Sequence, residues 1–484
     1  MNRKMIGKML GFLLLLECLF LLPPALISAW DGEREALRAI FATMALSAGA
    51  GVLLYGLCRN AERSFYAREG FLIVSLGWIL LSAVGALPFW FSKEIPHYVD
   101  AIFEVISGFT TTGASILNNV EGMSRGLLFW RSFTHWLGGM GILVFLLAGV
   151  PMGKGGYSVH LLRAESPGPS VSKLVPKMRQ TAAILYLIYI ALTVLCVLFL
   201  LLGGMPLFDS LCTAFGTAGT GGFGIKNDSM AGYSAYLQSV CTVFMALFGV
   251  NFSIYFLFLL GRVKQAMVNE ELGLYLGVML GSIAIITTNI LPHFGGHIRT
   301  ALHEAAFAVS SIMTTTGFAT ADFDQWPQLS RSILVVLMVV GACAGSTGGG
   351  IKCARLLLLG KSLTARIRQI LHPRSVNLIR VDGARVSDET IQGVNTYMAA
   401  YCAIGVVSFL ILALDNLSLE TNLTAVLACL NNIGPGLDMV GPTSNYAHFS
   451  DLSKIVLMLD MLLGRLEIFP LLIMLSPRTW RRAA

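Results

Sequence analysis

Ten long apolar stretches constrain the fold of this 484-residue chain more than any other feature of its sequence. About 20 consecutive apolar residues cross a bilayer as an α-helix. Only 13% of the residues are charged, against about 25% in a soluble domain, which excludes an ordinary soluble globule. We therefore expect an all-α polytopic membrane protein. The predicted spans cover residues 7–30, 36–58, 70–91, 126–150, 180–204, 237–260, 272–291, 331–359, 390–414 and 453–475.

Basic residues divide unevenly between the two sides of these spans. The segments that alternate to one face carry 24 Lys and Arg, and the opposite segments carry nine. Because cytoplasmic loops collect Lys and Arg, both termini are expected to be cytoplasmic. The net charge of +7 then reflects membrane topology, and we expect no nucleic-acid partner. The other face holds 16 acidic residues, which predicts an acidic outer mouth that concentrates cations.

Four segments between the spans are too apolar to be ordinary loops. Each contains about ten helix-forming residues followed by a turn rich in Thr, Gly or Asn, a pattern that suits a re-entrant half-helix and irregular backbone. These segments are 99–115, 207–224, 303–320 and 420–437. They align on Gly113, Gly222, Gly317 and Gly434. Thirteen positions earlier stand Asp100, Asp209, Glu304 and Thr421, which we expect in the first turn of each half-helix.

The unit of span, half-helix, glycine turn and span thus occurs four times, and repeats are a strong organisational signal. We expect two extra N-terminal transmembrane helices in 1–69, followed by four pseudo-symmetric pore repeats. The predicted repeats are 70–179, 180–271, 272–389 (with an intramembrane gating loop) and 390–484.

The four turns suggest a site for a monovalent cation. Irregular backbone at membrane depth is tolerated where it lines a water-filled cavity, and a ring of carbonyl oxygens can replace a cation's hydration shell. The C-terminal, partly negative ends of the half-helices would point to the same place. The predicted filter residues are Thr111, Thr112, Gly113, Thr220, Gly221, Gly222, Thr315, Thr316, Gly317, Asn432, Ile433 and Gly434. No HExxH or GxSxG motif occurs, so we expect neither an enzyme nor a cofactor.

Each span that follows a turn contains a glycine break 25 to 30 residues after the aligned glycine. The breaks lie at 138–141, 249–251, 345–350 and 464–465. The third break is the longest. It forms either a functional loop within the membrane or a close-packing contact between helices. Arg465 lies inside the last span, where a cation needs a partner or a water-filled cavity. It either pairs with Glu17, Asp460 or Glu467, or faces the pore and repels cations.

In combination, TTTGAS, TAGTGGFG, TTTGFAT and NNIGPGLD, with GSTGGGIK (345–352) and GRLEIF (464–469), resemble the Trk/Ktr/HKT superfamily of potassium transporters. The two extra N-terminal spans and the fourth segment are similar to the bacterial TrkH-type membrane subunit. The resemblance implies a pseudo-fourfold pore for potassium uptake across the bacterial inner membrane, with K⁺ at the filter residues. It also implies a homodimer and a cytosolic nucleotide-binding regulatory subunit of the TrkA type. The basic segment 352–389 is the expected docking surface for a cytosolic partner, and contact with the headgroups of membrane lipids explains its charge as well.

The resemblance further implies roles for the glycines and for the third break. Glycine at the aligned position of all four repeats goes with potassium selectivity, although the fourth turn departs from the Thr-rich pattern. The third break resembles the family's intramembrane gating loop. The implied gate residues are Gly345, Ser346, Thr347, Gly348, Gly349, Gly350, Lys352 and Arg465, and Lys352 could equally be an interface anchor. The alternative function is a secondary transporter that couples K⁺ to H⁺ or Na⁺ through Glu104, Asp460 or Glu467.

Overall fold

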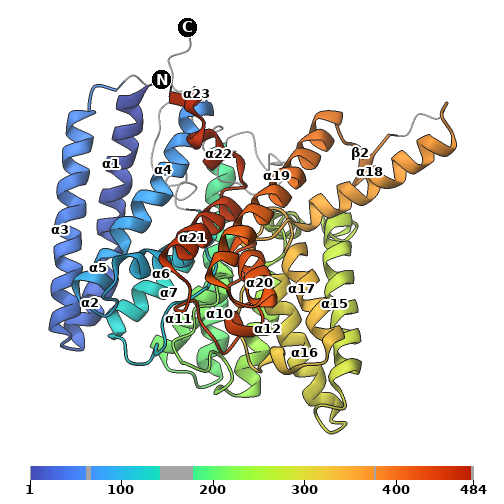
Figure 1. The fold of residues 1–484 in the computed structure, drawn as a ribbon, viewed down its shortest axis with the longest axis horizontal. Helices are drawn as coiled ribbons and strands as arrows, with labels where there is room; N and C mark the ends of the chain where they lie inside the picture. The colour runs from blue at the N-terminus through green and yellow to red at the C-terminus, as the bar shows by residue number, and fades with distance from the viewer. Residues whose placement is uncertain (1, 62–66, 142–177, 375–377, 481–484) are drawn as a thin grey trace.

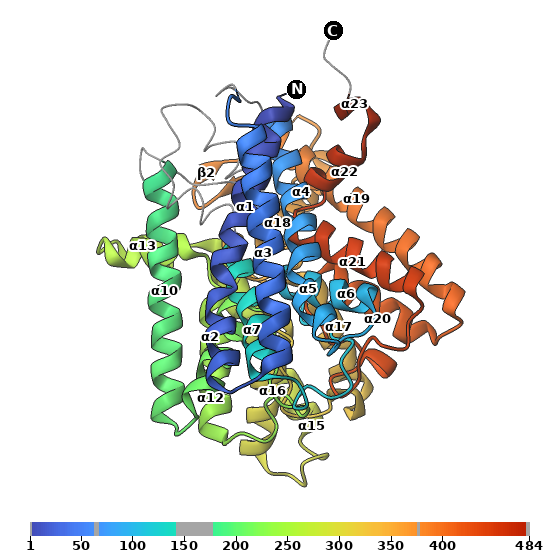
Figure 2. The same cartoon turned by 90° about the vertical axis from the view of Figure 1, so that its left-hand side faces the viewer.

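The computed structural model describes residues 2–61, 67–141, 178–374 and 378–480. In these ranges the regular structure is helical apart from one antiparallel pair of short strands, β1 (Arg380–Val381) and β2 (Ala384–Arg385). The N-terminal end of the first helix lies on the same side of the molecule as the last helix (Figures 1 and 2).

The two extra N-terminal spans form a hairpin along one side of the molecule (Figure 1). The hairpin consists of α1 (Arg3–Phe20), α2 (Leu22–Trp30) and α3 (Arg34–Leu57). Two prolines in the first turn of α2 end α1, because proline cannot donate the backbone hydrogen bond that a continuous helix needs. Helices α1 and α3 approach closely at Gly11 and Gly51, where a β-carbon on either glycine would press on the carbonyl oxygen of the other. Small residues permit such contacts between membrane helices.

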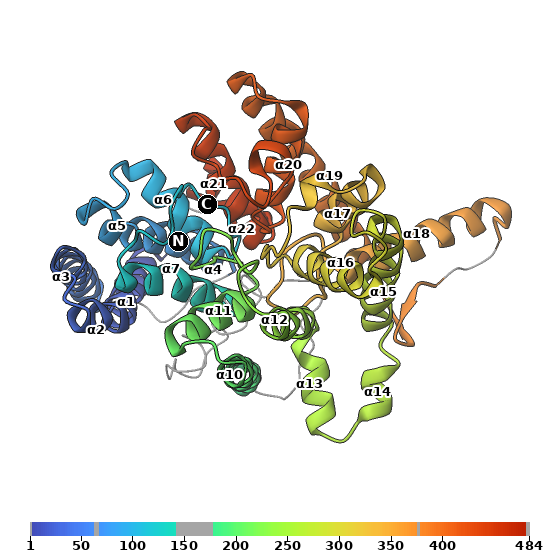
Figure 3. The same ribbon diagram turned by 90° about the horizontal axis from the view of Figure 1, so that it is seen from below.

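Four helical units follow the hairpin. The first consists of α4 (Ala67–Gly85), α5 (Leu87–Phe91), α6 (Tyr98–Phe109) and α7 (Arg125–Gly139). The second consists of α10 (Met178–Leu202), α11 (Leu207–Gly219), α12 (Ala235–Phe248), α13 (Phe252–Leu259) and the short α14 (Val263–Met267). The third consists of α15 (Glu270–Ile290), α16 (Ile298–Met313), η1 (Phe323–Gln325), α17 (Gln328–Val340) and α18 (Cys353–Leu371). The fourth consists of α19 (Asp388–Leu412), η2 (Ala413–Asp415), α20 (Leu419–Leu430), η3 (Asp438–Val440), α21 (Asp451–Arg465), α22 (Phe469–Leu475) and α23 (Pro477–Trp480). Figure 3 shows the four units in chain order around a common centre.

Six helical segments in the described ranges are long and apolar enough to cross a membrane, and they match the predicted spans 1, 2, 3, 5, 7 and 9. The four spans that follow a turn are broken, as the glycines predict. Helices α12 and α13 meet at an angle of 88°, α7 ends at Gly139, and α21 ends at Arg465. The second half of the fourth predicted span, 142–150, lies outside the described residues.

Two predicted details are wrong. The third break runs over residues 341–352 and begins four residues earlier than expected, because Gly341 has a positive φ of 71° and stops α17. The third half-helix is longer than the others, with 16 residues against 12 or 13. It begins at Ile298, so Glu304 lies in its second turn rather than its first.

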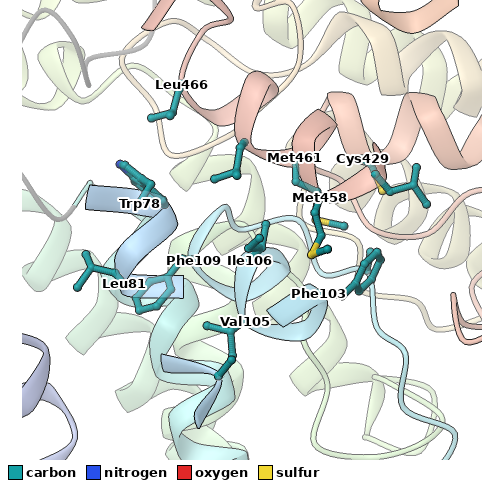
Figure 4. Packing of buried hydrophobic residues seen from close by; sticks show 14 of the residues in the cluster. Trp78, Leu81, Phe103, Val105, Ile106, Phe109, Cys429, Met458, Met461 and Leu466 are labelled. Atoms are coloured by element: carbon teal, nitrogen blue, oxygen red, sulfur yellow. The ribbon is translucent and has the colours of Figure 1, made fainter. Parts of the chain in front are cut away.

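The core of the first and fourth units lies between the half-helix α6 and the helices α4 and α21, which pack against it. Figure 4 shows Trp78 and Leu81 of α4 near Phe109, and Met458 and Met461 of α21 on the other side of α6. These side chains are buried. The packing places the C-terminal end of α6 in the interior of the molecule, where the first turn begins.

Candidate functional site

The four turns share one backbone conformation. In each, the residue two before the aligned glycine has a positive φ, and so does the glycine itself. The φ angles are 55° and 81° for Thr111 and Gly113, 54° and 74° for Thr220 and Gly222, 61° and 82° for Thr315 and Gly317, and 56° and 93° for Asn432 and Gly434. A β-branched residue with positive φ is a strained outlier. Strain repeated at three equivalent threonines is a mark of a functional site.

The hydrogen bonds of the turns repeat as well. In each turn, the backbone N–H of the residue before the aligned glycine donates to the carbonyl five residues earlier. These bonds are Thr112 to Ser107 (2.8 Å), Gly221 to Gly216 (2.9 Å), Thr316 to Ser311 (2.8 Å) and Ile433 to Ala428 (2.9 Å). The pattern is that of a helix closed by a left-handed residue. It aims the rest of the turn away from the half-helix axis.

The turns close a ring. A β-carbon added to Gly113 would overlap the carbonyl oxygen of Gly221. The same holds for Gly222 against Thr316, Gly317 against Ile433, and Gly434 against Thr112. Each aligned glycine thus lies against the carbonyl oxygen of the residue just before the aligned glycine of the next unit. The fourth contact, from Gly434 to Thr112, returns to the first unit and closes the ring. Glycine is required at these positions, because any side chain would push the next oxygen out of place.

The fourth turn keeps this geometry with different side chains. In the first and third turns, threonine hydroxyls pair at 2.8 Å, Thr110 with Thr112 and Thr314 with Thr316. In the fourth turn, the amide of Asn432 donates to the Thr112 hydroxyl (3.0 Å) and to the Met461 carbonyl (2.8 Å). The Asn432 side chain therefore joins the first and fourth units.

The position thirteen residues before each aligned glycine anchors its half-helix. Asp209 accepts a hydrogen bond from Tyr233 (3.0 Å), and Glu304 accepts one from Thr320 (2.5 Å). Asp100 pairs with Lys454 at 2.6 Å, which ties the first unit to the fourth. In the fourth unit Thr421 donates to Asp438 (2.7 Å). The hydrogen bonds from Ser418 and Thr421 hold the pKa of Asp438 below its usual range. The carboxylate missing at position 421 is therefore supplied by position 438.

A cavity of about 150 Å³ opens on the side of the ring away from the loop 341–352, and all four aligned glycines line it. The charged residues of its wall are Arg131 and Lys226. The acidic residues predicted to form the mouth do not line this cavity. Their negative charge acts from farther away, where salt screens it within about 8 Å at physiological ionic strength.

A buried ion pair that the sequence did not single out supports the first two turns. Arg131 of α7 donates to Glu104 of α6 at 2.6 Å, and both side chains are almost fully buried. Arg131 also donates to the Gly224 carbonyl (2.8 Å), and Glu104 accepts from Ser115 (2.9 Å) and from the Ile116 N–H (3.0 Å). The pair thus holds the backbone that leaves both turns.

Replacing Glu104 by glutamine is expected to destabilise the protein. It leaves the buried Arg131 without a counter-charge, which costs about 3–5 kcal/mol. The midpoint of thermal unfolding, followed by tryptophan fluorescence in detergent, should fall clearly. Glu35→Gln is the matched control, because its pair with Arg38 is exposed and contributes little. Equal midpoints for the two variants would contradict a supporting role for the pair.

His135 of α7 is also part of the support, and it is not a metal ligand. Its Nδ1 lies 2.7 Å from the Gly108 carbonyl, and its Nε2 lies 3.2 Å from the Phe223 N–H. Nδ1 therefore carries the proton and Nε2 accepts, so the ring is neutral. Both ring nitrogens are therefore used to hold the backbone of the first two units.

On the opposite side of the ring from the cavity, the loop 341–352 lies directly against the third and fourth turns. The Gly349 N–H donates to the Thr315 hydroxyl (2.6 Å), and the Gly350 N–H donates to the Asn431 carbonyl (3.0 Å). Ser346 and Thr347 are buried. Gly349 lies so close to Asn431 that a β-carbon there would overlap its carbonyl oxygen. The close approach explains the run of glycines in this loop.

Arg465 binds backbone oxygens of two other units. Its guanidinium donates to the carbonyls of Gly138 and Gly139, both at 2.5 Å, and to that of Thr347 at 2.9 Å. A longer contact of 3.4 Å reaches the Thr111 hydroxyl. The side chain thus connects the break of the first unit with the loop of the third, below the first turn.

The acids considered as partners of Arg465 are placed elsewhere. Glu467 pairs with Arg355, and Asp460 accepts from Ser408 of α19 (2.8 Å). Glu17 of α1 lies beside Gly85 of α4. Lys352 is buried and donates to the Gly348 carbonyl within the loop, so it is part of the loop structure and not an interface anchor.

Comparisons with known proteins identify the family. Residues 36–291 and 292–481 match the TrkH family, described as cation transport protein. The chain is 36% identical over 489 residues to the Trk system potassium uptake protein TrkH of Salmonella typhimurium, covering 99% of this chain and all of that protein. It is 35% identical over 490 residues to the protein of the same name from Escherichia coli K12, with the same coverage. The crystal structure of the potassium transporter TrkH from Vibrio parahaemolyticus matches with a TM-score of 0.89 at 32% identity, over 99% of this chain and all of that one. The chain is therefore an integral membrane protein that belongs to the TrkH family of cation transport proteins.

Proposed function

We propose that this chain takes up potassium by conducting K⁺ through the ring of four turns. The observation that carries the proposal is the closed ring, in which each aligned glycine meets the carbonyl oxygen of the next unit. Carbonyl oxygens replace the hydration shell of K⁺, and the C-terminal ends of four half-helices add partial negative charge. The names of the relatives, potassium uptake proteins, support the choice of ion.

The filter in this proposal consists of the residue with left-handed backbone, the residue after it and the aligned glycine of each turn. It thus includes Thr111, Thr112, Gly113, Thr220, Gly221, Gly222, Thr315, Thr316, Gly317, Asn432, Ile433 and Gly434. The gate consists of Arg465 and the loop residues Gly345, Ser346, Thr347, Gly348, Gly349, Gly350 and Lys352. Support comes from the contact of the loop with the third and fourth turns. The proposed division into the hairpin 1–69 and the repeats 70–179, 180–271, 272–389 and 390–484 differs by two or three residues from the first described residues of α4, α10, α15 and α19.

A channel-like mechanism is favoured over coupling to H⁺ or Na⁺. Coupling to protons needs a titratable group in the permeation path. Glu104 is paired with Arg131 and Glu467 with Arg355, while Asp460 lies between α21 and α19. The wall of the cavity at the ring contains none of the three. The family and the named relatives are transport proteins, which supports a role without enzymatic chemistry.

The protein in this proposal works in the bacterial inner membrane with both termini in the cytoplasm, as a homodimer with a TrkA-type nucleotide-binding subunit. Support comes from the shared side of the two ends (Figure 1) and from α18, which projects from the helical body. Its exposed apolar side chains are Leu363, Ile367, Ile370 and Leu371. Arg366 and Arg368 on the same helix suit an acidic partner or anionic lipid headgroups.

The test is cation flux into liposomes that contain the purified protein. We expect K⁺ and Rb⁺ to pass down their gradients and Na⁺ to pass much more slowly. Equal flux of K⁺ and Na⁺ would contradict the proposed selectivity. A flux that a pH jump drives against the K⁺ gradient would favour the coupled transporter instead.

A further inference from the structure

The loop 341–352 is held from one side by a single carboxylate. Glu271 lies in the first turn of α15 and is only 8% exposed. Its Oε1 accepts the backbone N–H of Ala344 at 2.5 Å. Ala344 lies in the first limb of the loop, three residues after Gly341, the residue that follows α17. The carboxylate therefore fixes the limb that leads to the buried residues Ser346 and Thr347.

The same carboxylate faces the other limb of the loop. The backbone N–H of Ala354, in the first turn of α18, and the charge of Lys352 both lie next to it. The N-terminus of a helix presents unsatisfied N–H groups and a partial positive charge, which a carboxylate stabilises. Glu271 thus lies beside both ends of the loop, hydrogen-bonded to Ala344 and next to the start of α18.

The break of the second unit, between α12 and α13, also contacts Glu271 and the loop. The side chain of Asn251 also faces Glu271, and its Oδ1 accepts the Ser253 N–H (2.9 Å), which starts α13. The Phe252 N–H donates to the Gly345 carbonyl (3.1 Å), and the Cys343 N–H donates to the Gly249 carbonyl (3.0 Å). The loop is therefore docked on the bend between α12 and α13, with Glu271 at the junction.

We infer that Glu271 is the positioning residue that holds the intramembrane loop in its obstructing place below the ring. The inference rests on the proposed function of the loop as a gate. Glu271 does not touch the permeating ion. It acts through the loop, because without its carboxylate the Ala344 N–H loses its acceptor. A buried donor without an acceptor is costly, so the loop would leave this position more often.

The experiment compares Glu271→Ala, Glu271→Gln and Glu270→Gln in the full-length protein. The readout is the modification rate of Cys343, a buried free thiol in the loop, by a small charged methanethiosulfonate, resolved by mass spectrometry. We expect Glu271→Ala to raise this rate about tenfold, the factor that the loss of one charged hydrogen bond produces. Glu271→Gln keeps an acceptor oxygen without the charge and should give a smaller rise. K⁺ flux into liposomes should rise in the same order.

Glu270→Gln is the matched control. Glu270 is the neighbouring residue and pairs with Lys361 of α18 and with the Asp382 N–H, away from the loop. In the Glu270→Gln variant, Cys343 should be modified at the same rate as in the native protein. Cys241, buried within α12, should stay unmodified throughout and reports unfolding.

A native modification rate at Cys343 in folded Glu271→Ala would overturn the inference. If that variant does not fold, a native rate in Glu271→Gln would do the same. The thiol readout needs no ion flux. Failure of the proposed function, seen as absent K⁺ flux in the native protein, is therefore distinguishable from failure of this inference.

Discussion

Replacing Arg465 by alanine is expected to raise the K⁺ flux of the protein in liposomes by roughly tenfold or more. The guanidinium binds the Thr347 carbonyl of the loop and the Gly138 and Gly139 carbonyls of the first unit. Its removal takes away both a tether of the loop and a positive charge below the ring. Two unit charges 5 Å apart repel by about 3 kcal/mol at an effective dielectric constant near 20, so the charge alone is a substantial barrier to K⁺.

Two further variants separate the tether from the charge. Arg465→Lys keeps the positive charge but cannot reach three carbonyl oxygens with one planar group, so it should raise the flux less than alanine does. Deletion of residues 346–349 removes the loop contact and keeps Arg465, and it should also raise the flux. Unchanged or lower flux in both Arg465→Ala and the deletion, with folded protein, would remove the gate from the proposed mechanism.

Replacing Gly113 by serine is expected to lower the preference for K⁺ over Na⁺ by about tenfold, the change that one weakened polar contact of roughly 1.4 kcal/mol would produce. The β-carbon of serine would overlap the carbonyl oxygen of Gly221, and the ring would have to open at this contact. The φ of 81° at position 113 adds strain for any residue with a side chain. The measurement is the ratio of K⁺ to Na⁺ flux in liposomes.

Gly204→Ser is the control for backbone strain. Gly204 has nearly the same φ, 80°, but a β-carbon there would meet nothing within 4 Å. This variant should lose stability without losing selectivity. If the two variants change the flux ratio equally, the ring contact at Gly113 does not determine selectivity.

Much of the site was accessible from the sequence because it depends on local chemistry. A glycine turn after a short apolar helix is visible as composition, and its fourfold recurrence identified Gly113, Gly222, Gly317 and Gly434. The structure gives these four the same positive φ. The position of Glu304 was missed, because the start of a half-helix depends on the preceding loop. The start of the third break at Gly341 was missed, since Gly341 resembles any other glycine at the end of an apolar run.

The membrane class, the fourfold repeat, the glycines of the ring and the breaks below them can all be predicted from the amino-acid sequence. Each of these follows from segment length, apolar composition or the need for a residue without a side chain, and such needs are satisfied within a few residues. The packed structure is needed to learn which oxygen meets which glycine, that Arg465 binds carbonyls of the first and third units, and that Glu104 pairs with Arg131. It alone places Glu271 at both limbs of the loop. These contacts join different helices, in several cases residues far apart in the chain, and they depend on how the helices pack, which no local pattern encodes.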